Sequence, residues 1–311
     1  MAQGGTDAIL TLFLIMGAGF LLKKTSIITK SGEQFMITLL QKAAIPALMF
    51  HSVQTQFTRS FLEENYPALL VAFLTILGSI IAGLVVSRLF RIRPANQGVF
   101  TVMFAFSNTI LIGLPVVTGV FGEGAVPWLM LYNLMNSFLF WTLGIWLIGG
   151  DQGAKLVSQE SLKKLFNPAV LSFLAGIVLL YQGITVPQPV MEGFRWMRDL
   201  VTPLSTLYMG AVIADLSFRK LPGLKPTLLI LFGRFVFSPL IALAILTFFG
   251  FSGEGVPVIV IVSALPVMTQ VSVMAGYYHK DRQYAAFMTA LTTLLTLLVI
   301  PVYLQLLKLI G

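Results

Sequence analysis

Apolar residues form long runs along the whole of this chain, and short polar or charged stretches separate them. A helix needs about 20 predominantly apolar residues to cross the hydrocarbon core of a bilayer. Runs close to that length occur at residues 7–23, 34–57, 66–90, 97–121, 127–149, 168–183, 194–216, 226–250, 256–278 and 284–310. The pattern predicts an all-α integral membrane protein with ten transmembrane helices, of which the sixth is the shortest.

The composition supports a membrane protein and narrows its chemistry. Of the 311 residues, 57% are hydrophobic and only 10% are charged, whereas a soluble domain carries roughly 25% charged residues. The chain has no cysteine and two histidines, which excludes disulfides, thiolate metal sites and a histidine-rich metal centre. We find no glycine-rich nucleotide loop, metal-ligand cluster or nucleophile–base motif, so neither ATP-driven transport nor an enzyme is expected.

The basic residues predict the orientation of the spans. Fourteen of the twenty lysines and arginines fall in the connections that leave the odd-numbered spans, four fall in the other connections or at the end of the chain, and two lie within spans. Cytoplasmic loops of membrane proteins are enriched in such residues. We therefore expect both termini outside the cytoplasm, and we read the net charge of +8 as cytoplasmic loop charge rather than as a nucleic-acid surface.

The longest hydrophilic connection, residues 150–167, divides the chain into two sets of five spans, residues 1–149 and 168–311. An odd number of spans in each half places the two halves in opposite orientations, which is an inverted repeat. The division thus predicts two inverted five-helix repeats joined by a cytoplasmic loop.

Two of the spans contain helix-weakening residues near their middle. Gly113 and Pro115 interrupt span 4, and Pro266 interrupts span 9, so that Gly-Leu-Pro-Val in the first half is echoed by Ala-Leu-Pro-Val in the second. Proline removes a backbone donor and clashes with the preceding turn. A broken helix survives in a membrane only where protein or a water-filled cavity covers the break. Interrupted spans at matching positions in two halves indicate the binding site of a transporter.

These residues, in their order and spacing, resemble the auxin efflux carrier family of secondary transporters over nearly the whole chain. The segments that carry the resemblance are Ala44–Phe50, Asn108–Pro115, Asn167–Pro168, Thr202–Ala211, Ala264–Val267 and Leu291–Pro301. The family includes plant auxin carriers of the PIN type and bacterial malate and malonate permeases. The short central loop favours the bacterial permease branch, and with it a location in the bacterial inner (plasma) membrane.

The resemblance implies that spans 4 and 9 are broken helices that cross near the membrane centre. It also implies a scaffold of spans 1, 2, 6 and 7, a moving transport unit of spans 3–5 and 8–10, and a homodimer.

Polar groups near the crossing are the candidate substrate ligands. A broken helix offers a helix N-terminus whose unpaired N–H groups attract anions, and amide and hydroxyl side chains can add donors. The candidates are Asn108, Gly113, Pro115, Asn133, Asn136, Pro266, Thr269 and Gln270. The alternative for the asparagines is hydrogen bonding between helices, and for Thr269 and Gln270 it is solvation of a helix end. Spans 4, 5 and 9 contain no arginine, so we expect neutral donors to hold a carboxylate.

Three charged residues in or at the end of spans are candidates for coupling or charge compensation. Lys42 precedes Pro46 by one turn and either attracts an anion, replaces a coupling cation, or extends its amine to the cytoplasmic face. Asp215 ends span 7, where a surface ion pair is the alternative to a proton site. Arg234 lies about two turns into span 8 and reaches either the interface or Asp215. His51 is expected at the outer end of span 2, with an interfacial role.

The sequence therefore predicts a secondary transporter that moves a small organic anion, such as malate or malonate, across the lipid bilayer by alternating access. No cofactor or metal is expected, and coupling to H⁺ or Na⁺ is left open. Alternatives are an auxin-like carrier of aromatic monocarboxylates and a receptor that senses a carboxylate without moving it. A cation antiporter of similar architecture would be expected to carry acidic residues in spans 4 and 9, and neither core contains one.

Overall fold

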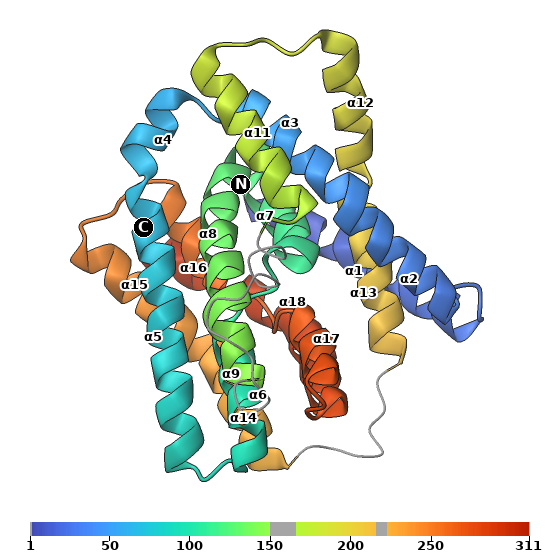
Figure 1. Cartoon of the computed structure of the whole chain (residues 1–311), viewed down its shortest axis with the longest axis vertical. Coiled ribbons are helices and arrows are strands. Elements are labelled where there is room, and N and C mark those ends of the chain that lie inside the picture. The colour runs from blue at the N-terminus through green and yellow to red at the C-terminus, as the bar shows by residue number, and fades with distance from the viewer. Residues whose placement is uncertain (1, 150–165, 216–222, 311) are drawn as a thin grey trace.

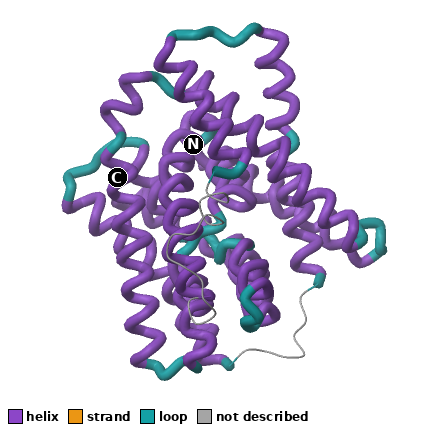
Figure 2. Tube along the Cα trace, viewed as in Figure 1, coloured by secondary structure: helices purple, strands orange, loops and turns teal. Residues whose placement is uncertain are grey.

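A computed structural model describes residues 2–149, 166–215 and 223–310. Most of the predicted central connection lies outside these residues. Helices account for nearly all of the described chain, and none of it forms a β-strand beyond one isolated bridge (Figures 1 and 2). The first half contains α1 (Ala2–Lys24), α2 (Lys30–Leu39), η1 (Leu40–Ala44), α3 (Ile45–Gln56), α4 (Arg59–Asn65), α5 (Pro67–Leu89), α6 (Pro94–Ala105), η2 (Thr109–Gly113), α7 (Leu114–Phe121), η3 (Glu123–Ala125), α8 (Val126–Leu139), η4 (Phe140–Gly144) and α9 (Ile145–Gly149).

The second half contains nine described elements. These are α11 (Pro168–Gln182), α12 (Gln188–Asp199), α13 (Val201–Ala214), α14 (Leu224–Phe232), η7 (Gly233–Phe237), α15 (Ser238–Phe248), α16 (Gly255–Ser263), α17 (Gln270–Tyr277) and α18 (Arg282–Ile310). The prediction of an all-helical chain is confirmed.

Several helices are long and apolar enough to cross a membrane. Within the described residues, four unbroken helices meet that test, at Lys30–Gln56, Pro67–Leu89, Glu123–Gly149 and Leu224–Phe248. Arg282–Thr296 and Leu298–Leu307 pass the test only together, and they meet at 47°, as the two parts of a broken span or of a re-entrant segment do. Thr109–Phe121 and Pro168–Gln182 are apolar but shorter. The length and apolar composition of these helices indicate a membrane protein. The number of ten spans and their arrangement as an inverted repeat remain predictions.

The predicted interruption of span 4 is real, but its position was wrong. The helix ends at Ala105, and Phe106 and Asn108 adopt non-helical backbone angles before η2 begins. Gly113 and Pro115 lie within the helix that follows the break. In span 9 the break falls where it was predicted, since α16 ends at Ser263 and α17 starts at Gln270.

Wider π-helical turns explain why three of the prolines do not break the helices that contain them. Three such turns, η1, η2 and η7, each end two residues before a proline, namely Pro46, Pro115 and Pro239. A proline ring clashes with the carbonyl four residues earlier and leaves it without a donor. A π turn at that position moves the carbonyl away, so the helix continues through the proline.

The helices pack as two groups (Figure 1). In one group, α1 packs against α13, and α3 packs against α11 and α12. In the other, α5 contacts α6, α8 and α15, while α16 contacts α8 and α15. The groups meet where α1 and α13 contact α7 and η2. This seam passes beside α7 and η2, the part of span 4 that follows its break, so it brings both groups to the candidate site.

Candidate functional site: the crossing of two broken helices

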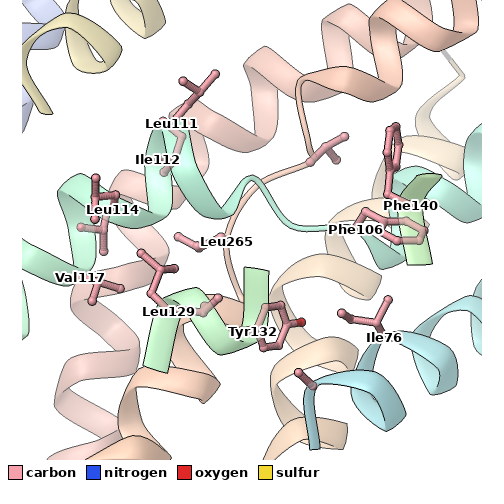
Figure 3. Packing of buried hydrophobic residues seen from close by; sticks show 14 of the residues in the cluster. Ile76, Phe106, Leu111, Ile112, Leu114, Val117, Leu129, Tyr132, Phe140 and Leu265 are labelled. Atoms are coloured by element: carbon pink, nitrogen blue, oxygen red, sulfur yellow. The ribbon is translucent and has the colours of Figure 1, made fainter. Parts of the chain in front are cut away.

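The two interrupted segments cross as a short antiparallel pair in the middle of the molecule. Ser107 and Val267 form an isolated bridge. The backbone N–H of Asn108 donates to the carbonyl of Pro266 (2.9 Å), and that of Met268 donates to the carbonyl of Phe106 (3.2 Å). Figure 3 shows Leu265 and Phe106 on the two extended segments, with Leu111, Ile112 and Leu129 packed nearby. The backbone groups freed by the breaks are therefore paired in part with each other.

Each extended segment is also held by a helix of the next span, which is α8 in the first half and α18 in the second. The Asn136 side chain in α8 accepts from the N–H of Ser107 (3.2 Å) and donates to its carbonyl (3.0 Å). In the second half, the Thr292 hydroxyl in α18 accepts from the N–H of Val267 (3.1 Å). Asn136 and Thr292 are both fully buried. The two halves thus support the crossing in the same way with different side chains.

The C-terminal ends of α6 and α16 converge on one buried cation, Arg234. Its guanidinium is fully buried and donates to the carbonyls of Ala105 (2.9 Å), Ser263 (2.8 Å) and Leu265 (2.7 and 3.0 Å). It also reaches the hydroxyls of Ser107 and Ser238. A buried charge is costly unless hydrogen bonds satisfy it. Carbonyl oxygens at helix C-termini carry partial negative charge, so they stabilise this cation in place of a carboxylate.

Arg234 therefore lies at the crossing rather than at the interface or beside Asp215, the two positions that the sequence left open. The distance along span 8 could not reveal this, because it gives depth but not the direction of the side chain. Asp215 instead lies 3.2 Å from Lys23 at the end of α1, and Lys23 also pairs with Glu33 (2.5 Å). This matches the surface ion pair that was the alternative for Asp215, and Lys23 is its cation.

The N-terminal ends of the second half-helices lie on the other side of the crossing. Asn108 is the N-cap residue of η2 and Thr269 is that of α17, and neither side chain caps its own helix. Instead, Asn108 Nδ2 donates to Thr269 Oγ1 at 2.9 Å. Thr269 and the adjacent Gln270 are partly exposed. No side chain caps either helix, although the first-turn N–H groups of Thr109, Val271 and Ser272 donate to the nearby backbone carbonyls of Ser107, Met268 and Thr269.

The other predicted ligands lie around this pair. Asn133 accepts from the Thr109 hydroxyl at 2.6 Å, and Gly113 donates its N–H to the Asn108 carbonyl at 3.1 Å. Pro115 is buried two residues beyond Gly113, and Pro266 is buried at the bridge. The structure thus gathers Asn108, Asn133, Asn136, Pro266 and Thr269 within one network. It gives Asn133 and Asn136 protein partners, and their roles as ligands stay predictions.

Lys42 lies apart from this network. It is exposed on η1, which packs against α11, α12 and α13, and it forms no hydrogen bond or ion pair with the described residues.

Among the described residues, no group of three or more histidine, aspartate or glutamate side chains could hold a metal ion. The network also contains Ser107, Thr109, Ser263 and Thr292, which were not predicted as site residues, because hydroxyls are common in apolar spans and only their proximity in space marks them.

A fold with two broken helices crossing inside a membrane is characteristic of a transporter, and comparison with known proteins agrees. The family model described as "Membrane transport protein" matches residues 5–164 and 154–304. The chain therefore belongs to this family, the auxin efflux carrier family, and the predicted resemblance is confirmed.

Two archaeal relatives align over almost their whole length. An uncharacterized transporter of Methanothermobacter thermautotrophicus is 23% identical over 308 residues, which are 97% of this chain and 98% of the relative. An uncharacterized transporter of Methanocaldococcus jannaschii is 22% identical over 304 residues, 96% and 97% of the two chains. The family and the relatives identify a membrane transporter, not an enzyme.

Proposed function

We propose that this protein is a secondary transporter of a small organic anion, and that the anion's carboxylate binds at the crossing beside Asn108 and Thr269. The observation that carries the proposal is the separation of charge at the crossing. Arg234 neutralises the carbonyl ends of α6 and α16, while the N–H ends of η2 and α17 have no side-chain cap. The uncompensated partial charge at the crossing is thus positive, which favours an anion.

The donors at this site suit a ligand that must be released again. Asn108 and Thr269 already bind each other, so a carboxylate that enters exchanges one hydrogen bond for new charge-assisted ones. An arginine fork would hold a carboxylate more tightly, but the Arg234 donors are directed at carbonyls and hydroxyls. The neutral donors expected from the sequence therefore fit the site. The buried cation at the crossing, Arg234, was not expected there.

We propose alternating access as the mechanism. In this reading α1–α3 and α11–α13 form the scaffold, and α5–α9 with α14–α18 move against it and carry the crossing. The proposal is supported by the seam between the two groups, which passes beside α7 and η2. The protein is further proposed to lie in the plasma membrane as a homodimer with both termini outside the cytoplasm, as the basic residues and the resemblance indicate.

The carbonyl ends of the broken helices bear on coupling to a cation gradient. Carbonyls at the ends of broken helices are the groups that bind Na⁺ in many transporters, and here Arg234 occupies them. We therefore propose that no Na⁺ is required at this position and that Arg234 supplies the fixed charge. We propose Lys42 as a second charge-compensating residue, because it is an exposed cation in a π turn of span 2.

Uptake by proteoliposomes tests the function. Labelled malate, malonate and an aromatic monocarboxylate would be compared, with the pH and Na⁺ gradients imposed separately. We expect saturable uptake of a small dicarboxylate without a need for Na⁺. Preference for the aromatic acid would support the auxin-like alternative, and specific binding without uptake would support the receptor. Equal competition by the uncharged diamide of the transported acid would contradict a site for anions.

A further inference from the structure

A polar cavity lies between the two helix groups. It has a volume of about 250 Å³, slightly below the ~300–1,000 Å³ of typical small-molecule sites. Leu48 of α3, Thr202 of α13 and the pair Arg198 and Asp199 of α12 form one wall. Leu114 and Thr118 of α7 and Glu123 of η3 form the other. The cavity therefore opens along the seam, and its inner wall includes the residue directly after η2.

Arg198 is the centre of the charged groups in this cavity. Its guanidinium lies 3.1 Å from Glu123, 3.2 Å from Asp199 and 3.2 Å from Nδ1 of His51. The Arg198 side chain is only 15% exposed, whereas Glu123 and Asp199 are 54% and 55% exposed. The cation is thus held in the cavity, and the two carboxylates that neutralise it lie at its mouth.

We propose that this cavity is a capture site for the transported anion, in which the substrate carboxylate takes the place of Glu123 on Arg198. The inference rests on the proposed transport of an organic anion. A guanidinium presents a planar set of donors that matches a carboxylate. Glu123 is about half exposed, and an ion pair with a solvated partner contributes little net stability, so the exchange of one carboxylate for another at Arg198 is close to balanced. Such a site binds weakly, as a position on an access path must.

Glu123 has a second hydrogen-bond partner, which it keeps when the substrate displaces it from Arg198. Gln56 at the end of α3 donates to the same carboxylate oxygen, Glu123 Oε2, at 3.2 Å. The released carboxylate therefore keeps a hydrogen bond and stays near the cavity. Because Arg198 belongs to α12 and Glu123 to the turn before α8, displacement also removes an ion pair that joins the two helix groups.

Initial rates of labelled malonate and malate uptake in proteoliposomes test the proposal with three variants. Arg198→Gln should raise KM by at least about tenfold, because it removes a charged donor. Glu123→Gln should lower KM by about two- to fivefold, since it removes the competing carboxylate from an exposed pair. Arg195→Gln is the matched control, because Arg195 lies one turn earlier on α12 and pairs with Glu192 alone among the described residues.

The opposite signs distinguish capture from a structural ion pair. An ion pair that only fastens the two helix groups would make Arg198→Gln and Glu123→Gln change KM in the same direction, and that result overturns the capture site. An equal effect of Arg195→Gln overturns it as well. If Arg198→Gln does not fold, a KM for Glu123→Gln at or above that of the unmodified protein is sufficient to overturn it. Absence of uptake by the unmodified protein would instead refute the proposed function itself.

Discussion

The N-cap residues of the two half-helices, Asn108 and Thr269, hydrogen-bond to each other at 2.9 Å across the crossing. They are 161 positions apart in the sequence, and each would ordinarily cap the first turn of its own helix. Their pairing joins the two broken spans and leaves the helix N-termini uncapped. The carbonyls of Ser107, Met268 and Thr269 accept from three of the first-turn N–H groups, and an anionic substrate is a stronger acceptor than these neutral carbonyls.

The first prediction concerns this pair. Asn108→Ala should raise the dissociation constant for the transported carboxylate by roughly ten- to a hundredfold, since a hydrogen bond to a charged group contributes about 1.5–3 kcal/mol. Thr269→Val should weaken binding in the same direction. Calorimetry on purified protein measures the effect, and Asn65→Ala on α4 provides an asparagine outside the crossing as control. Unchanged affinity in Asn108→Ala would move the binding site elsewhere.

The second prediction concerns Arg234. Arg234→Met leaves the carbonyls of Ala105, Ser263 and Leu265 without their donor, and each unpaired buried group costs about 1–3 kcal/mol. We expect a loss of several kcal/mol in unfolding free energy, measured by denaturation in detergent. Arg234→Lys should lose less, because the charge remains but fewer donors do. Lys225→Met near the start of α14 is the control. A stable Arg234→Met variant whose uptake becomes dependent on Na⁺ would show that the carbonyls form a cation site.

The sequence predicted the helical membrane fold and the two interrupted spans because both depend on local properties. Long apolar runs need no knowledge of partners, and the residues around Pro266 indicated a break where α16 ends. The break in span 4 was predicted too far along the chain, because proline disrupts helices and Pro115 was taken as its cause. The extended backbone at Phe106–Asn108 is instead held by side chains of other spans, Asn136 and Arg234. No local pattern contains that information.

The candidate site was predicted only in part for the same reason. Thr269 was found because it follows Pro266, and Asn108 because it begins the Asn108–Pro115 segment that carries the family resemblance. The contacts of Arg234 and the grouping of His51, Glu123 and Arg198 depend on how helices far apart in sequence pack together. His51 was expected to have an interfacial role at the outer end of span 2. In the structure, the Arg198 guanidinium lies 3.2 Å from its Nδ1.

The third prediction concerns the close contact of α1 and α13. A Cβ added at Gly19 would lie 2.1 Å from the carbonyl oxygen of Leu207, so the two backbones touch there. Small residues permit such approaches between helices in membranes. Gly19→Ala should lower the unfolding free energy by about 1–3 kcal/mol through overpacking. Gly17→Ala, two residues away on the same helix, has open space around its Cβ and should be neutral. Equal stabilities of the two variants would contradict the contact.

The fourth prediction concerns orientation in the membrane. The chain has no cysteine, so a single cysteine can be placed on either side without background labelling. Ala95 is exposed at the start of α6, in a connection rich in arginine, and Ser252 is exposed between α15 and α16. If the basic residues set the orientation, Ala95→Cys should react with a membrane-impermeant maleimide only from the cytoplasmic side, and Ser252→Cys only from outside. The comparison requires intact cells and inverted vesicles, with permeabilised membranes as the control for reactivity. Reaction of both cysteines from one side would refute the ten-span topology and the inverted relation of the two halves.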